Sequence, residues 1–496
     1  MANLGIHVLE QATAVSIPVV ADSGLPYVTG VAPIHMATKP GKVNTPILCT
    51  SWDEAVAKLG FSYDWKKYPI CEFIYSHFQL FGCQPVIFCN VMDPDKMKAD
   101  VEAKEYTVED HMVRLPLAAM SDTVKVTMKT ANSANEGSEG GDTSAGSGTS
   151  GEATLEVDED YSVYYDYKTD SCVVELLETG ASYEVEAISI SYTEVKPEKV
   201  ALVDIVEGVT HVDDCMTAVG KIPDTLCTPA WSHNTVVAAI MATKSAGIMG
   251  LFHGKCLIDA DCSKTGVRDY SELAGYKNKN NFVDENQIVC WPQVKLGDYQ
   301  FHLSTQLAGL MAKVDTLNAG CPYESPSNKA LKMDTCCLED GTEVNLNWPQ
   351  VNIVAGDYGV VTAVNFLVGG WVAKGNYTAC YPGNTDVKDI FIPVSRMFDW
   401  VGNTLIRTFW SKLDKPMNRR LIDSILDTCN IWLAGLVGTE RLLGARAEML
   451  ESENNLLDLM AGIIRIHIYI TPPSPMQQCD FTLEYDTSYV ESALAA

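Results

Sequence analysis

The chain has 496 residues, 47% of them hydrophobic, and its 64 acidic against 36 basic side chains give a net charge of −28. This length predicts roughly two to four domains, each with an apolar interior. The acidic balance argues against binding to nucleic acid phosphates or to anionic membranes, because like charges repel.

Cysteine usage and targeting patterns indicate where the chain folds. The 16 cysteines lack the regular spacing of a small secreted disulfide scaffold. The start of the sequence has no basic patch before an apolar stretch, and no uninterrupted apolar run reaches the ~18 residues of a membrane span. We therefore expect folding in a reducing cytosol, without an export signal and without membrane insertion.

The N-terminal residues are β-prone and are punctuated by glycine and proline. Residues 6–10 and 13–20 are predicted to be extended, and Ile6, Val8 and Leu9 are the apolar positions of the first stretch. We interpret residues 1–20 as an N-terminal arm.

Residues 21–115 alternate between strand-like and helix-like patterns. A strand is predicted at 27–32, a helix begins at the N-cap Ser51, and a second helix is predicted at 69–81. The nearly continuous apolar run at 86–91 is typical of a strand that is covered on both faces. This order predicts α/β construction.

Residues 116–199 interrupt that order and predict an inserted, β-rich outer domain. Between Pro116 and Val200 there are 17 acidic and 5 basic residues, so this stretch is much more acidic than the rest of the chain. Such a charge is typical of an exposed module. Residues 131–153 are almost entirely small or polar and predict a flexible loop. The strands are predicted at 124–128, 161–167, 172–177 and 183–192.

The α/β alternation resumes at residue 200 and extends to 384. The predicted strands lie near 226–230, 256–261 and 288–291, and the predicted helices lie at 235–246 and 305–317. Together with residues 21–115, this region is interpreted as the core of the protein.

Three local patterns suggest catalysis or metal binding but have simpler structural explanations. Residues 146–151 spell GxGxxG, yet they lie in low-complexity sequence and not between a strand and a helix. A cluster from His253 to Cys262 has a spacing that suits zinc, but alternation along a strand would point its members to opposite faces. No nucleophile elbow and no GxxxxGK(S/T) loop occurs. We expect no catalytic residue, no cofactor and no metal. The cluster consists of His253, Cys256, Asp259, Asp261 and Cys262.

Residues 385–479 predict two amphipathic helices, a short helix and a strand. Apolar residues recur at helical spacing over 393–410 and again over 421–436, with Asp414 and Pro416 as the expected start of the second helix. A short helix is predicted at 455–461 and a half-buried strand at 464–470.

A proline-rich link at 472–475 leads to the last segment, residues 480–496. Phe481, Leu483 and Tyr485 alternate with polar residues, which predicts a strand with no chain left beside it to pair with. We interpret this segment as a C-terminal arm.

Three short stretches between residues 359 and 378 match the specific motif of a known family. The two amphipathic helices, the proline-rich link and the terminal strand described above follow these stretches in the same order as in that family. The chain resembles the C-terminal domain of contractile tail sheath proteins, found in long-tailed contractile phages and in related bacteriocins and injection systems. The resemblance is strong over 357–486, weaker over the first 95 residues and over 200–332, and absent between. Lys374 stands where the family has tryptophan. The matching residues are Gly359, Val360, Val361 and Thr362; Gly369, Gly370 and Trp371; Gly375, Asn376 and Thr378; and Arg396, Asn455 and Gly462.

The resemblance implies a mixed α/β, multidomain sheath fold and a structural function without enzymatic activity. The family's N- and C-terminal arms add strands to sheets of neighbouring subunits, which gives that role to Ile6, Val8, Leu9, Phe481, Leu483 and Tyr485. It also implies hexameric rings that stack around a tail tube, with the tube, baseplate and tail-terminator proteins as partners. The resulting virion component would be assembled in the cytoplasm of a bacterial host, and contraction from a metastable extended state would drive the tube through a target envelope.

The region between 385 and 450 is near neutral, with nine basic and eight acidic residues, which suits an inner position in such an assembly. A functional interpretation of its basic residues is contact with the tube, and the simpler one is a solvated helix face. These residues are Arg419, Arg420, Arg441 and Arg446. Two other classes stay open from the sequence: a cytosolic α/β enzyme of unrecognised type built on residues 200–333, and a non-contractile virion protein.

Overall fold

The computed structural model describes residues 17–129, 152–180, 182–366 and 369–495. The predicted strand that contains Ile6, Val8 and Leu9 lies outside the described residues, and so do residues 131–151 of the predicted flexible loop.

A six-stranded sheet in the order β13-β12-β11-β1-β3-β2 forms the centre of the core. Every neighbouring pair is parallel except β2–β3, which places an antiparallel strand at one edge. The apolar runs of the sequence are explained by this position, because parallel strands are covered on both faces. The strands are β1 (Pro26–Gly30), β2 (Ile47–Cys49), β3 (Val86–Asn90), β11 (Thr225–Cys227), β12 (Lys255–Asp259) and β13 (Gln287–Cys290).

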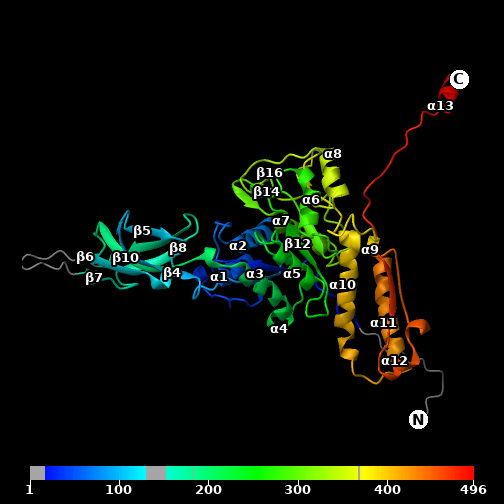
Figure 1. Ribbon diagram of the computed structural model, residues 1–496, viewed down its shortest axis with the longest axis horizontal. Coiled ribbons are helices and arrows are strands. Elements are labelled where there is room, and N and C mark those ends of the chain that lie inside the picture. Colours follow the sequence, from blue (N-terminus) through cyan, green and yellow to red (C-terminus); the bar gives the residue numbers. More distant parts are fainter. Residues whose placement is uncertain (1–16, 130–151, 181, 367–368, 496) are drawn as a thin grey trace, which may run out of the picture.

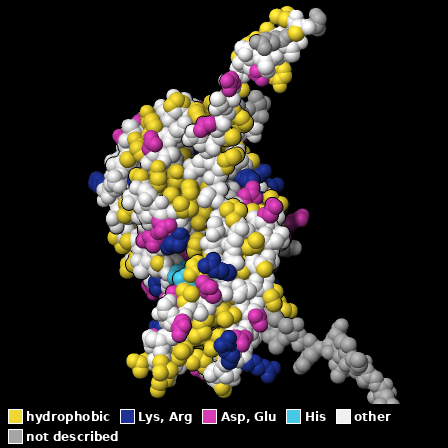
Figure 2. Space-filling model, turned by 90° about the vertical axis from the view of Figure 1, so that its right-hand side faces the viewer, with side chains coloured by type: hydrophobic (Ala, Val, Ile, Leu, Met, Phe, Trp, Pro, Cys, Tyr) yellow, Lys and Arg dark blue, Asp and Glu magenta, His cyan; other side chains and the backbone are white. Residues whose placement is uncertain are grey.

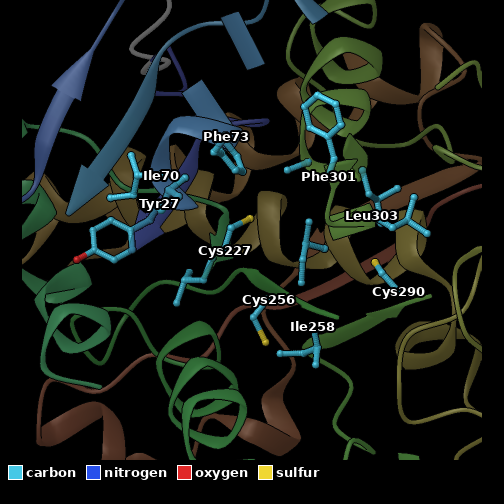
Figure 3. Close-up of a cluster of buried hydrophobic side chains, with 14 of the residues drawn as sticks. Tyr27, Ile70, Phe73, Cys227, Cys256, Ile258, Cys290, Phe301 and Leu303 are labelled. Atoms are coloured by element: carbon cyan, nitrogen blue, oxygen red, sulfur yellow. The ribbon is translucent and has the colours of Figure 1, made fainter. Parts of the chain in front are cut away.

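Helices cover both faces of this sheet. On one face lie α3 (Leu202–Thr210) and α5 (Thr235–Ser245), and on the other lie α2 (Pro69–Ile74) and α7 (Leu303–Leu317). Figure 3 shows how Tyr27, Ile70 and Phe73 fill the interior near β1, and Ile258 and Leu303 near β12. The predicted helices at 69–81, 235–246 and 305–317 are confirmed within one or two residues at their ends.

Local signals set the boundaries of the helices before the β-domain. The hydroxyl of Ser51 accepts a hydrogen bond from the amide of Glu54 at 3.2 Å and caps α1 (Trp52–Leu59), as predicted. Helix α2 continues as a π-helical segment, η2 (Tyr75–Phe81), and ends at Gly82, whose φ of 62° is in the left-handed region.

A separate β-domain is inserted between β3 and α3. It consists of one sheet in the order β4-β10-β6-β7 and a second in the order β5-β9-β8, with its own hydrophobic core between them. Its first strand begins at Lys98, ahead of the boundary at residue 116 that the alternating pattern indicates. The strands are β4 (Lys98–Thr107), β5 (Met112–Pro116), β6 (Lys125–Lys129), β7 (Glu152–Thr154), β8 (Tyr161–Asp166), β9 (Ser171–Leu176) and β10 (Ala187–Val195).

Smaller elements extend the core toward the C-terminus. A three-stranded sheet in the order β15-β14-β16 and a β17–β18 hairpin follow the parallel sheet. Lys374, which replaces the family's tryptophan, lies over the ring of Trp348 at 5.4 Å and not over Trp371, whose indole donates to the carbonyl of Asp334. The elements are α4 (Cys215–Val219), α6 (Leu273–Lys279), β14 (Gln293–Leu296), β15 (Tyr299–Phe301), β16 (Thr335–Cys337), α8 (Trp348–Val351), η7 (Asn352–Asp357), β17 (Thr362–Val364) and β18 (Val372–Lys374).

The C-terminal unit, residues 387–471, packs two long helices against a two-stranded sheet. Its hydrophobic core is separate from that of the parallel sheet and contains Met397, Trp400, Cys429 and Leu433. The elements are α9 (Val387–Ile390), α10 (Ile392–Phe409), α11 (Arg419–Gly438), β19 (Gly444–Glu448), α12 (Leu456–Met460) and β20 (His467–Thr471). A final helix, α13 (Ser488–Leu494), lies within the C-terminal arm.

The predicted start of α11 is wrong. Asn418 caps the helix by accepting from the amide of Leu421 at 3.0 Å, and Asp414 lies in the preceding turn with a φ of 61°. Helix α11 is also long and apolar enough to cross a membrane by length and composition, but buried residues such as Leu433 and Leu436 pack within the C-terminal unit.

Figure 1 shows the molecule as an elongated series of three parts. The β-domain lies at one end, the parallel sheet lies in the middle, and α10 and α11 lie at the other end. The C-terminal arm leaves the unit and carries α13 away from the body.

All 16 cysteines are free thiols, and every one except Cys479 is buried. Among the described residues, which include the cluster from His253 to Cys262, no group of three or more His, Cys, Asp or Glu is arranged to hold a metal ion.

Candidate inter-subunit interface

The C-terminal arm has apolar side chains that its own subunit does not cover. Phe481, Leu483 and Tyr485 are 85%, 95% and 77% exposed, and the segment is not paired with any described strand. Among the described residues beyond Met476, the hydrogen bond from Gln477 to the hydroxyl of Tyr377, at 2.9 Å, joins the arm to the body. A segment that alternates apolar and polar residues but lies in solvent is suited to a strand partner elsewhere.

The β19–β20 sheet offers such a partner. Its two strands pair antiparallel from Gly444 opposite Thr471 to Glu448 opposite His467. The outer edge of β19 is partly covered, because the side-chain amide of Asn430 on α11 exchanges hydrogen bonds with the N–H and C=O of Ala447, both at 2.9 Å. The outer edge of β20 has no strand beside it among the described residues. An exposed strand edge is a template for pairing with another chain.

The N-terminal linker, residues 17–25, is held along helix α10. The amides of Val19 and Ala21 donate to the hydroxyls of Thr408 and Thr404, at 2.9 and 3.0 Å. The indole of Trp400 donates to the carbonyl of Ala21 at 3.1 Å. The arm that precedes residue 17 is therefore joined to the C-terminal unit as well as to the core.

Charged side chains continue this attachment. Asp22 forms ion pairs with Lys221 of the core at 2.6 Å and with Arg407 of α10 at 3.0 Å. Two residues later the linker passes so close to α7 that a Cβ on Gly24 would lie 2.7 Å from the Cα of Ala312, and the φ of Gly24 is +69°. Only glycine fits both constraints without strain.

Arg396 forms the centre of a buried ion cluster between α10, α7 and the linker. Its guanidinium donates to both oxygens of Asp315, at 3.1 and 2.5 Å, and to Asp224 at 2.9 Å. The side chains of Arg396 and Asp315 are only 3% and 0% exposed. Asp224 also accepts from the amides of Gly24 and Leu25. The arginine that the family resemblance placed at the start of this helix thus fixes the C-terminal unit to the core.

The four arginines singled out in the sequence do not form one patch. Arg419 is 89% exposed and pairs with Asp423 at the start of α11, and Arg420 is exposed beside it. Arg441 follows the other end of this 20-residue helix, which is roughly 30 Å long. Arg446 lies over the ring of Tyr469 at 3.8 Å.

A polar cavity of about 400 Å³ lies at the carboxyl ends of the core strands and is the place where an α/β enzyme would bind a ligand. Two of its acidic groups, Asp259 and Glu72, are engaged by neighbouring side chains. Asp259 accepts from the hydroxyls of Ser232 and Ser304, at 2.9 and 2.5 Å, and Glu72 pairs with His302 at 2.9 Å. These contacts join the loops above the sheet to each other.

The Glu72–His302 pair predicts a pH dependence of stability. Burial alone would lower the pKa of His302, but the charge and hydrogen bond of Glu72 outweigh it and raise this pKa to about 9. Because the folded pKa lies above the unfolded value, the pair contributes fully below about pH 6.5 and its contribution is lost as the pH rises through about 9. We expect roughly 2–3 kcal/mol of the free energy of unfolding to be lost across this window.

Urea unfolding between pH 6 and pH 9.5 measures this loss, and the Glu72→Gln variant should show a flatter profile. Asp214→Asn is the matched control, because Asp214, the partner of His211, is 58% exposed whereas Glu72 is 2% exposed. An unchanged profile for Glu72→Gln would contradict the assignment.

Known proteins are similar to this chain along nearly its whole length. No protein-family profile matches it. The tail sheath protein of Burkholderia phage BcepMu is 25% identical over 98% of this chain and 97% of its own length. The sheath of the PVC extracellular contractile injection system in its contracted state has a TM-score of 0.56 at 11% identity, with 99% of both chains covered. The helical sheath of the anti-feeding prophage, also contracted, has a TM-score of 0.56 at 12% identity, with 98% of this chain and 100% of that chain covered.

These likenesses define the class: the fold is that of contractile sheath proteins over nearly the full chain. Along its whole length the chain is also similar to the tail sheath protein of a phage. The relative and both solved structures are sheath proteins, which agrees with the structural, non-enzymatic function that the resemblance implied.

Proposed function

We propose that this protein polymerises as stacked hexameric rings around a tail tube and contracts from a metastable extended state, which drives the tube through a target envelope. One observation supports a linkage between subunits by strand pairing. The same chain has an exposed, alternating segment at 481–485 and, among the residues that the structure describes, an edge of β20 with no strand beside it. Pairing between copies would satisfy both.

Strand addition of this kind tolerates large movements. Each backbone hydrogen bond contributes only about 0.5–1.5 kcal/mol net, but every subunit would donate and accept strands. The proline-rich link and the N-terminal linker would let rigid subunits change their packing without separating. The energy for contraction would then come from the contacts between subunits in two packings.

The three parts of the molecule suit different radii in such a tube. We assign the acidic β-domain to the outside; it extends from residue 98 to residue 195 and contains most of the insertion predicted at 116–199. The near-neutral unit at 385–479 is assigned to the inside, where Arg419 and Arg420 at one level and Arg441 and Arg446 at another would face the tube. The core at 21–115 and 200–384 connects them. Residues 1–20, through Ile6, Val8 and Leu9, would donate a second strand. The tube, baseplate and tail-terminator proteins are the proposed partners, and assembly is proposed in the cytoplasm of a bacterial host.

Negative-stain imaging of the purified protein tests the proposal. We expect wide hollow tubes with helical striations, and a shorter, wider form after brief heating or mild urea. A monodisperse monomer at all concentrations, or solid filaments without a lumen, would overturn it.

A further inference from the structure

The last helix and the short helix beside β20 have matching apolar faces that nothing in the described chain covers. On α13, Tyr489, Val490 and Leu494 are 74%, 38% and 79% exposed. On α12, Leu456, Leu457 and Met460 are 72%, 77% and 77% exposed. Val490 and Leu494 on α13 share a face because they are four residues apart, and Met460 on α12 shares a face with Leu456 and Leu457, which are four and three residues before it. Figure 2 shows hydrophobic side chains gathered at the lower end of the C-terminal unit, the end at which both α12 and the turn between α10 and α11 lie in Figure 1.

Helix α13 needs a packing partner to be stable. It has seven residues, whereas isolated helices shorter than about 12 residues are marginal in water. Its start is nevertheless specified, since Asp486 accepts from the amide and the hydroxyl of Ser488 at 2.9 and 2.6 Å. A helix with a defined start that follows the strand segment within two residues therefore implies a docking site close to where that strand pairs.

The direction of strand addition places this docking site. Strand β20 runs from His467 to Thr471, and α12 precedes it in the chain. Antiparallel addition, the slightly more stable arrangement, would bring the end of the arm strand beside His467. Only Asp486 and Thr487 separate Tyr485 from α13, so at about 3.3 Å per residue the helix would start within roughly 10 Å of that end of the sheet. Helix α12 is at this same end.

We propose that α13 of one subunit packs on α12 of the neighbouring subunit whose β20 strand its arm extends, and so acts as a latch on the strand exchange. The proposal rests on the proposed function, because it needs the arm strand to be added to β20. The occupant is a segment of this chain, since its apolar face, its length and its connection all fit the α12 surface. In its own subunit α13 lies at the opposite end of the C-terminal unit from α12 (Figure 1).

Cysteine cross-linking in assembled tubes tests the latch. The background is Cys479→Ser, because Cys479 is the exposed thiol and the remaining cysteines are buried. With Leu457→Cys and Val490→Cys together, mild oxidation of tubes should give a ladder of covalent multimers on a non-reducing gel. The matched control combines Val490→Cys with Leu317→Cys, which is 75% exposed at the end of α7, and should give no ladder.

A second variant separates the latch from the strand. A chain that ends at Thr487 keeps the arm strand and should still form tubes, but these tubes should dissociate at a lower urea concentration than the full-length ones. Tubes that form without a ladder in the Leu457/Val490 pair, or with an equal ladder in the control, would overturn the latch and leave strand exchange intact. Failure of the full chain to form tubes would overturn the proposed function and the latch with it.

Discussion

Replacement of Arg396 by alanine is expected to lower the free energy of unfolding by about 3–5 kcal/mol. The reason is that the substitution leaves the buried carboxylate of Asp315 without its cationic partner. Asp315 is fully buried, and Arg396 donates to both of its oxygens. A buried charge without its partner costs far more than the pair contributes, because neither water nor another cation replaces the lost hydrogen bonds. The loss should also loosen the N-terminal linker, since Ser23 donates to the same carboxylate at 2.6 Å.

Urea denaturation with tryptophan fluorescence measures this loss, and Trp400 on α10 is a suitable reporter. Arg396→Lys should recover only part of the stability, because an ammonium cannot make the bidentate contact. The matched control is Arg419→Ala on the neighbouring helix, whose exposed pair with Asp423 should change the stability by less than about 0.5 kcal/mol. If Arg396→Ala falls within the range of this control, the cluster does not hold the C-terminal unit on the core.

The sequence predicted well those elements in which burial on one face or on both faces sets the pattern of apolar residues. The parallel strands β3, β12 and β13 are short apolar runs because helices cover both of their faces. Helices α10 and α11 show their buried stripes at helical spacing, since each presents one face to the core of the C-terminal unit. The alternation before Thr471 marks β20 in the same way.

The features that the sequence could not predict depend on contacts between distant residues. Strand β4 is largely exposed on both faces, so its residues do not alternate and the β-domain begins earlier than the pattern suggests. The bonds from Val19 to Thr408 and from Asn430 to Ala447 depend on tertiary placement and leave no local pattern. The buried role of Asp315 is equally hidden, because nothing in its own helix requires a charge there. The sequence could not show which edge of the β19–β20 sheet is available, because Asn430 occupies the outer edge of β19 only in the folded structure. Among the described residues, the outer edge of β20 has no strand beside it.

Removal of either arm is expected to give a folded, soluble monomer that no longer forms tubes. A chain that ends at Pro475 loses exposed side chains and the Gln477–Tyr377 hydrogen bond, so its unfolding midpoint should stay near that of the full chain. At the other end, the cut should fall before Ile17, since Val19 and Ala21 bind α10. Circular dichroism and size-exclusion chromatography would show the folded monomer, and negative stain would show the loss of tubes.

Point substitutions in the arm distinguish strand addition from a general need for length. If the arm adds to a sheet edge, its alternate side chains face opposite sides, and only one set packs against the neighbour. Serine at Phe481, Leu483 and Tyr485 together should therefore abolish tubes, because each loses the burial of a large side chain worth roughly 1.5–3 kcal/mol. The matched control, Thr482→Ser with Glu484→Gln, keeps the backbone and changes only the other face, so tubes should persist. Loss of tubes in both variants would show that the arm acts without the alternation of a strand. Normal tubes in the triple variant would instead show that burial of these three side chains does not hold the subunits together.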